Sequence, residues 1–393
     1  MAIVVQKYGG SSVADVEKLG RVADKVVSTV RAGDQVVVVI SAMGKTTDEL
    51  LALAKQVDEN PPRRELDMLL TTGERVSMAL LSMAIQKRGA PAISFTGSQS
   101  GIITNDRHFD ARILEVRPHR IEDELARGKI VIVAGYQGMS YRREITTLGR
   151  GGSDTTAIAL AAALGAERAE IYSDVDGIYT ADPRVVPDAQ HLAQLSYDEM
   201  QEMAEAGAKV LNATAVEFAK NAKIAIHARS TFDTKRESVI TAAPSSSRTV
   251  TGQRGVSRVH VGGGADGLRR ALVACGEAHI DPREVEAAGD SASFLVFVGV
   301  TPDWDAGRRV IERACPGVRF EDGLATVSVV GDGLGRDAPA LAKAMSAIAE
   351  CGLLPLRTAT TPLRLAFLLH EASADNAVRA LHGALVAEQV PAE

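Results

Sequence analysis

Short, nearly continuous apolar runs rich in Val and Ile alternate with longer segments of helical periodicity along the first 240 residues. The runs AIVVQK, QVVVVISAMG and KIVIVAGYQG have the length of strands, whereas VEKLGRVADKVVSTVRAG and AIALAAALGAERA have the apolar spacing of helices. Parallel strands need helical crossovers and are buried on both faces, so their sequences are nearly continuous apolar runs of this kind. The pattern therefore predicts an α/β fold with a largely parallel sheet.

Glycine and hydroxyl residues cluster where several of these strands should end. GGSS follows VVQK, SAMGKTT follows VVVVI, and GYQG follows IVIVA. In open α/β sheets the ligand sits at the carboxyl ends of the strands. We therefore expect these clusters to serve a ligand site at one edge of the sheet.

The amino-acid composition of the chain changes after residue 240. The stretch TAAPSSSRTVTGQRG is rich in Ser, Thr, Pro and Gly and predicts a linker. Behind it, segments that begin at Gly255 and Gly323 repeat one pattern of strand, glycine-bearing turn and helix, each followed by a further strand and helix. We expect a unit at residues 1–240 and two small βαββαβ modules at 255–322 and 323–393. A tandem pair favours ligand sensing or dimerisation.

Composition narrows the functional classes. With a net charge of −6 over 393 residues, no surface for nucleic acid is expected. The apolar runs around Val36 and Ile130 fall short of the roughly 20 residues of a bilayer span, and the N-terminus lacks the features of a signal peptide. The three cysteines, Cys275, Cys315 and Cys351, are scattered, which favours reduced packing residues. These features predict a cytoplasmic protein with no membrane partner.

The segment Lys7-Tyr8-Gly9-Gly10-Ser11-Ser12 is a candidate phosphate site. It is not a Walker A loop, because its lysine precedes the glycines. Glycines at a strand end allow backbone N–H groups to approach phosphoryl oxygens, and a lysine adds a positive charge. An ordinary tight turn with an exposed lysine is the alternative.

The segment TTLGRGGSDTTAIALAAALGA is the second candidate. Arg150, Ser153 and Asp154 stand where an alanine-rich helix should begin. A helix N-terminus suits a carboxylate or phosphate, and an arginine adds a bidentate donor. In the alternative interpretation Ser153 or Asp154 caps the helix and Arg150 is solvated, which leaves the glycines unexplained.

Three further positions have both a functional and a structural interpretation. The loop YSDVDGIYTADPR is suited to hold a nucleoside, although Asp-Gly and Asp-Pro are also plain turn formers. Glu74 in LLTTGER is either a ligand group or an acid in the first turn of a helix. Thr46 or Thr47 in SAMGKTTDEL either contacts a ligand or caps the next helix.

Taken in order, KYGGSS, VVVVISAMGKTTDEL, LLTTGER, SFTGSQSGI, TTLGRGGSDTTA, EIYSDVDGIYTADPR and EAGAKVL resemble the catalytic half of aspartate kinases over about residues 1–235. The tandem modules look like the ACT domains of these enzymes. The resemblance implies the amino-acid kinase fold, a three-layer αβα sandwich. It also implies ATP- and Mg²⁺-dependent phosphorylation of L-aspartate to 4-phospho-L-aspartate for lysine, threonine and methionine synthesis, in a homodimer or homotetramer under amino-acid control.

The same resemblance implies roles for individual residues. ATP would be bound by Lys7, Gly9, Gly10, Ser11, Ser173, Asp174, Tyr179, Asp182, Arg184 and Lys209. Aspartate would be bound by Thr46, Glu74, Tyr136, Arg150 and Ser153. Catalysis would rest on Lys7, Arg150, Asp154 and Lys209, and no protein ligand to a metal is expected. The attacking carboxylate is already ionised at neutral pH, so Asp154 would organise Lys7 and not act as a base.

The chain departs from the family pattern in three places. Tyr136 stands where a phenylalanine is usual, and its hydroxyl needs a partner. KVLNATAVEFA lacks the usual basic or histidine-containing pattern, and GGGADG, EVEAAGDSAS and RTATTPLR replace the usual effector segments. We therefore expect weak or altered feedback by lysine or threonine. A kinase for another small acid and a non-catalytic amino-acid sensor are the alternatives.

Overall fold

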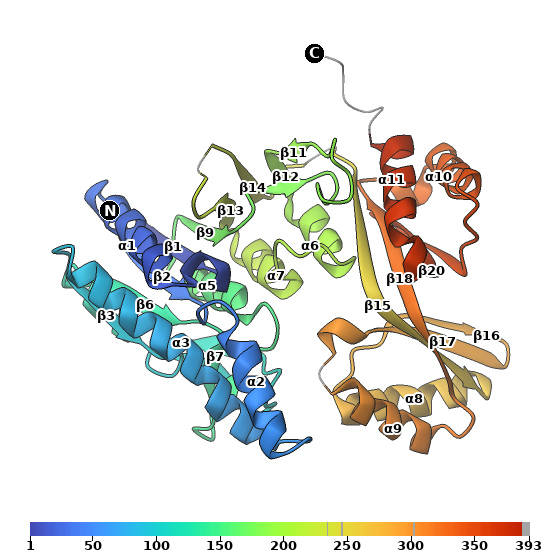
Figure 1. Cartoon of the computed structure of the whole chain (residues 1–393), viewed down its shortest axis with the longest axis horizontal. Coiled ribbons are helices and arrows are strands. Elements are labelled where there is room, and N and C mark those ends of the chain that lie inside the picture. Colours follow the sequence, from blue (N-terminus) through green and yellow to red (C-terminus); the bar gives the residue numbers. More distant parts are fainter. Residues whose placement is uncertain (234, 245–246, 302, 387–393) are drawn as a thin grey trace, which may run out of the picture. The chain divides into compact units, whose positions relative to one another are not determined.

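The computed structural model describes residues 1–233, 235–244, 247–301 and 303–386. The chain forms two compact units. The first consists of Met1–Ile178, His191–Ala204 and Lys209–Ser245, and the second of Tyr179–Gln190, Glu205–Ala208 and Ser246–Glu393. Each unit has its own central sheet (Figure 1).

An eight-stranded sheet forms the centre of the first unit, in the order β12-β14-β13-β9-β1-β2-β6-β3. Its strands are β1 (Ile3–Tyr8), β2 (Gln35–Ile40), β3 (Ala92–Phe95), β6 (Ile130–Ala134), β9 (Arg168–Ser173), β12 (Gln194–Ser196), β13 (Ala225–Ser230) and β14 (Glu237–Thr241). Every neighbouring pair is parallel except β13 and β14. The predicted α/β fold with a mainly parallel sheet is confirmed.

Helices cover both faces of this sheet. The helices of this unit are α1 (Val16–Arg31), α2 (Thr46–Val57), α3 (Arg63–Gln86), α4 (His119–Ala126), α5 (Gly152–Ala163), α6 (Tyr197–Glu205) and α7 (Ala213–Ala222). On one face α1 and α3 pack against Val36 and Val38. On the other face the start of α5 lies beside Val39. The evidence is at Gly135, where an added Cβ would contact the side chains of both Ser153 and Val39. Because successive side chains of a strand point to opposite faces, β2 contacts a helical layer on each side of the sheet.

A smaller sheet in the same unit follows the order β5-β4-β7-β8. It consists of β4 (Ile102–Thr104), β5 (Ile113–Val116), β7 (Gln137–Ser140) and β8 (Ile145–Thr147). The chain enters it from β6 through Tyr136 and leaves it into α5 through Leu148–Gly151. The short strands β10 (Ile178–Tyr179) and β11 (His191–Leu192) complete the strands of this part of the chain.

An antiparallel six-stranded sheet forms the second unit, in the order β16-β17-β15-β18-β20-β19. Its elements are β15 (Thr249–Gly262), α8 (Gly264–Ala278), β16 (Arg283–Ala288), β17 (Ser291–Phe297), α9 (Trp304–Ala314), β18 (Arg319–Val330), α10 (Ala338–Glu350), β19 (Arg357–Thr361), β20 (Arg364–His370) and α11 (Ala374–Leu385). In Figure 1, α8 and α9 cover one end of the sheet, and α10 and α11 cover the other.

The two long strands β15 and β18 run through both halves of this sheet. The first half of β15, Thr249–Arg254, pairs with the last part of β18, and its second half pairs with β17. Separate cores lie under each helix pair, one around Phe294 and one around Phe367. The prediction of a linker is therefore wrong from Thr249 onward. The limits proposed for the two modules stay predictions.

Two sequence-based expectations about packing are settled by burial. Cys275 and Cys315 are buried free thiols in the core under α8 and α9, as expected, whereas Cys351 is free but exposed. Among the described residues one helix, α3, has a length and composition that would suffice to cross a membrane. Its residues Leu81 and Ile85 instead pack in the core against α1 and the sheet.

Candidate active site

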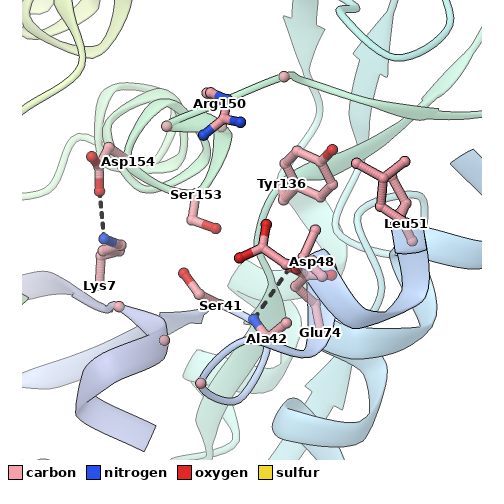
Figure 2. A pocket seen from close by; sticks show the side chains of 18 of the residues that line it. Lys7, Ser41, Ala42, Asp48, Leu51, Glu74, Tyr136, Arg150, Ser153 and Asp154 are labelled. Carbon is pink, nitrogen blue, oxygen red and sulfur yellow. Dashed lines mark hydrogen bonds and ion pairs between the residues drawn. The ribbon is translucent and has the colours of Figure 1, made fainter. Parts of the chain in front are cut away.

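A cavity of about 350 Å³ lies at the carboxyl ends of β1, β2 and β6 and at the start of α5 (Figure 2). Its lining comes from segments far apart in the sequence. It consists of Lys7, Gly9, Gly10, Ser41, Ala42, Gly44, Thr47, Asp48, Leu51, Leu70, Glu74, Phe109, Tyr136, Gly149, Arg150, Gly151, Gly152, Ser153 and Asp154. The sheet edge predicted to hold the ligand site is thus the edge at which the cavity lies.

Lys7 and Asp154 form an ion pair at one end of the cavity. Lys7 Nζ lies 2.7 Å from Asp154 Oδ1, and both side chains are about nine-tenths buried. Nearby, the turn after β1 approaches the turn after β2 at Gly10, where a Cβ would lie 2.9 Å from the Ala42 carbonyl oxygen. Tight contact between the turns after β1 and β2 therefore requires glycine at position 10.

The segment before α5 is shaped by glycines. Gly149 and Gly151 have φ of 72° and 73°, which favours glycine because other side chains are strained there. Gly151 is the N-cap residue of α5, so Ser153 and Asp154 lie within the first turn of the helix. The interpretation of Ser153 or Asp154 as a capping residue is therefore wrong. Figure 2 shows Arg150 and Ser153 across the cavity from Ser41.

Glu74 is a buried carboxyl group in the cavity wall. Its Oε1 accepts a hydrogen bond of 3.2 Å from the Ala42 N–H, and its buried Oε2 has no hydrogen-bond partner among the described residues. Burial raises the pKa of Glu74 to about 7, against the opposing effect of the Ala42 N–H. Glu74 lies in the middle of α3, so the interpretation as a first-turn acid is wrong. An unpartnered buried oxygen is costly and suits a cationic ligand group.

Tyr136 follows β6 with an unusual backbone. Its φ is 68°, and its carbonyl accepts a hydrogen bond of 2.9 Å from the Leu148 N–H. Burial raises the pKa of Tyr136 to about 12, and a side-chain hydrogen bond with Thr147 acts in the opposite direction. Thr147 is thus a close neighbour of the extra hydroxyl noted in the sequence.

Several residues predicted for the site do not line the cavity. The Thr46 hydroxyl donates a 2.7 Å hydrogen bond to the Met43 carbonyl, whereas the neighbouring residues Thr47 and Asp48 face the cavity. Lys45 is the N-cap residue of α2, so neither threonine caps that helix. Ser11 lies in the short 3₁₀ helix Gly10–Val13 and is exposed.

The residues predicted for the nucleotide are spread over both units. Ser173 ends β9 beside Gly9, whose N–H donates to the Tyr172 carbonyl at 3.2 Å, and the following Asp174 is exposed. Lys209 is exposed in the segment before α7. Tyr179, Asp182 and Arg184 belong to the second unit, where the last two form an ion pair of 2.7 Å. Their contact with a nucleotide stays a prediction.

Ser41, Phe109 and Asn212 are among the residues near the site that the sequence analysis did not single out. Ser41 directly follows β2 and was detectable as a hydroxyl at a strand end. Phe109 reaches the cavity from the loop after β4, and no local pattern marks it. Asn212 caps α7 through its Oδ1 and donates a 3.1 Å hydrogen bond from Nδ2 to the Arg150 carbonyl. A Cβ on Gly151 would lie 2.6 Å from that nitrogen, so the contact depends on the glycine.

Comparison with known proteins agrees with this geometry. Residues 2–230 match the model of the amino acid kinase family. The chain is 45% identical to the aspartokinase of Mycolicibacterium smegmatis, with 98% of this chain and 96% of the relative covered. It is 43% identical to the aspartokinase of Corynebacterium glutamicum, with 97% and 96% covered.

Solved structures lead to the same family. Aspartokinase III of E. coli in complex with aspartate and ADP, in the R-state, is 25% identical with a TM-score of 0.86, and 98% of this chain and 99% of that chain are covered. The T-state of the same enzyme, in complex with lysine and aspartate, is 26% identical with a TM-score of 0.73, and 97% and 99% are covered. The chain therefore belongs to the amino acid kinase family and, within it, to the aspartokinases.

Proposed function

We propose that the cavity binds L-aspartate beside the terminal phosphate of ATP and that the chain phosphorylates the β-carboxylate of aspartate to 4-phospho-L-aspartate. The observation that carries the proposal is the set of charges in one cavity: Lys7 and Arg150 are cationic, and Glu74 has a buried oxygen that finds no partner in the part of the chain that the structure describes. A substrate with two carboxylates and one ammonium group needs this combination. Relatives that are named aspartokinases support it.

The individual roles follow from charge and position. Arg150 would bind the α-carboxylate through two N–H groups, and Glu74 would accept from the ammonium group. Ser153 and Tyr136 line the same cavity. Lys7 would approach the transferred phosphoryl group, with Asp154 holding its ammonium group in place. No general base is needed, because the carboxylate nucleophile is already ionised and the barrier is repulsion between anions.

ATP would approach the cavity from the turn after β1. Gly9 and Gly10 line the cavity there next to Lys7, and their backbone N–H groups would approach the phosphate oxygens. The described residues contain no cluster of three or more His, Cys, Asp or Glu side chains that would hold a metal. Mg²⁺ would therefore enter as part of the substrate MgATP, whose phosphate charge it neutralises.

The second unit would supply regulation and assembly. Its antiparallel sheet with two helix pairs supports the prediction of tandem ACT-like modules. Binding of a lysine or threonine effector and association into a dimer or tetramer are the roles that we propose for it. Feedback would be weak or altered, because few acids and amides stand in the segments where an effector would bind. The proposed location is the cytoplasm.

The proposed reaction is tested by a coupled assay of ADP release with MgATP and L-aspartate, glutamate or N-acetylglutamate as the acceptor. We expect turnover with aspartate and at least tenfold lower kcat/KM with the other two. Lys7→Ala should lower kcat by about 100-fold, because an electrostatic contact to the transferred group of this kind contributes about 3 kcal/mol. Formation of an acyl phosphate is checked by trapping with hydroxylamine.

Three outcomes would speak against the proposal. Preference for glutamate or N-acetylglutamate would identify a kinase for another small acid. No turnover with any acceptor would favour the non-catalytic sensor. Unchanged kcat in Lys7→Ala, measured on a variant with the same thermal stability as the wild type, would remove Lys7 from the reaction.

A further inference from the structure

Asp67 is a fully buried carboxylate on α3 that does not line the cavity, and three donors converge on it. The Thr147 hydroxyl donates to Oδ1 at 2.6 Å, and His108 Nδ1 lies 2.6 Å from Oδ2. The Phe109 backbone N–H lies 3.1 and 3.2 Å from the two oxygens. The side chain of Asp67 has an exposed fraction of 0%. A carboxylate is kept in such a place only where donors replace its lost hydration.

The partners of Asp67 lead to the two aromatic side chains of the cavity. His108 and Phe109 belong to the loop after β4, and Phe109 lines the cavity. Thr147 ends β8, and the N–H of the next residue, Leu148, donates a 2.9 Å hydrogen bond to the carbonyl of Tyr136, the other aromatic residue of the lining. One carboxylate is therefore connected to both aromatic walls.

Both aromatic residues have strained backbones. Phe109 has a φ of 71° and Tyr136 a φ of 68°, a region that bulky residues rarely adopt. Such strain is unfavourable and persists only where the surroundings enforce it. At Phe109 the enforcing contact is the N–H bond to Asp67. At Tyr136 it is the hydrogen bond from the Leu148 N–H to the Tyr136 carbonyl.

We propose that Asp67 is a positioning residue that holds both aromatic walls, Phe109 directly and Tyr136 through Thr147, and thereby sets the affinity for the amino-acid substrate. It acts on binding and not on phosphoryl transfer, because Lys7 and Asp154 lie outside its hydrogen bonds. This inference rests on the proposed function.

Thr147 allows a sharper test than Asp67, because a neutral residue at position 67 could prevent folding. Thr147→Val keeps the size of the side chain and removes the hydroxyl, whereas Thr147→Ser keeps the hydroxyl. The matched control is Thr146→Val in the same strand, whose buried hydroxyl lies 2.6 Å from that of Thr104 and outside the Asp67 contacts. Asp67→Asn completes the set.

We expect Thr147→Val to raise KM for aspartate roughly three- to tenfold, the range that follows from one lost hydrogen bond, with kcat and KM for MgATP within twofold of the wild type. Thr147→Ser and Thr146→Val should leave KM unchanged.

A readout without substrate separates this inference from the proposed reaction. Amide hydrogen exchange in the segment 105–112 of the free protein should be at least tenfold faster in Asp67→Asn than in the wild type and unchanged in Thr146→Val. Unchanged exchange together with unchanged KM, or a fall in kcat without a rise in KM, would overturn the inference. Absence of turnover in the wild type would contradict the proposed function, and faster exchange would still establish that Asp67 holds the loop.

Discussion

Glu74 shows at the scale of one residue how burial prepares a binding group. The residue is 3% exposed, and within the described ranges its carboxyl group has one hydrogen bond, from the Ala42 N–H, and one oxygen without a partner. The resulting pKa of about 7 means that the free protein keeps a proton there which an unfolded chain would lose near pH 4.5. A substrate ammonium group would stabilise the ionised form and release that proton on binding.

This linkage predicts the stability of Glu74→Gln. Between about pH 4.5 and 7 the unfolded wild type binds fewer protons than the folded form, so its stability falls as the pH rises. The glutamine variant has no ionisable group at position 74, so it does not lose stability in this way as the pH rises. We expect its free energy of unfolding, relative to the wild type, to rise between pH 4.5 and pH 8 by up to about 3 kcal/mol.

The measurement is urea denaturation of both proteins at the two pH values without substrate. The same variant should raise KM for aspartate by about tenfold or more at pH 8, because a hydrogen bond to a charged group is lost. An equal difference in stability at both pH values would show that Glu74 is already ionised in the free protein.

At the scale of secondary-structure elements, Asn212 connects the start of α7 to the segment before α5. Its Oδ1 accepts from the N–H groups of Thr214 and Ala215 at 2.9 and 3.3 Å, and its Nδ2 donates to the Arg150 carbonyl. One side chain thus caps a helix and steadies the segment that carries a proposed substrate-binding arginine.

Two substitutions separate these two roles. Asn212→Asp keeps the capping oxygen and replaces the donor by an acceptor, whereas Asn212→Ala removes both. We expect Asn212→Ala to lose about 1 kcal/mol of stability and Asn212→Asp to lose much less. Both variants should raise KM for aspartate severalfold, because Arg150 loses its backbone support. Thermal melts and steady-state kinetics check this, and unchanged KM in both variants would confine Asn212 to capping.

At the scale of the whole molecule, the chain forms two compact units with different contents. The first contains the cavity, and the second contains a sheet with two cores and two helix pairs. In the T-state structure of the E. coli relative, lysine is bound together with aspartate. An effector amino acid needs partners for its ammonium and carboxylate groups, and the segments GGGADG, EVEAAGDSAS and RTATTPLR offer few of them.

The corresponding prediction concerns feedback. Turnover of aspartate at concentrations near KM should change by less than twofold when lysine, threonine or both are added at millimolar concentrations. The assay is ADP release, with each amino acid also tested on the coupling enzymes as a control. A submillimolar inhibition constant for either amino acid would mean that the second unit binds it through residues other than those expected.

Much of the fold and part of the site were predictable because their signals are local. Buried parallel strands appear as runs of Val and Ile, and glycines mark the turns after β1 and before α5. Lys7 lies near the end of β1, Arg150 in the segment before α5 and Asp154 in the first turn of α5, and all three line the cavity. The motifs also identified the family, because each combines a fixed spacing with a definite position at a strand or helix end.

Other features arise from contacts that no local pattern records. Which of Thr46 and Thr47 faces the cavity depends on how α2 is turned, and Phe109 arrives from a loop held by a carboxylate on α3. The burial that shifts the pKa of Glu74 comes from neighbours distant in the chain. Thr249–Arg254 forms a strand because β18 supplies its partner. Local periodicity thus specified the elements and their turns, whereas packing between distant segments set side-chain direction, burial and charge.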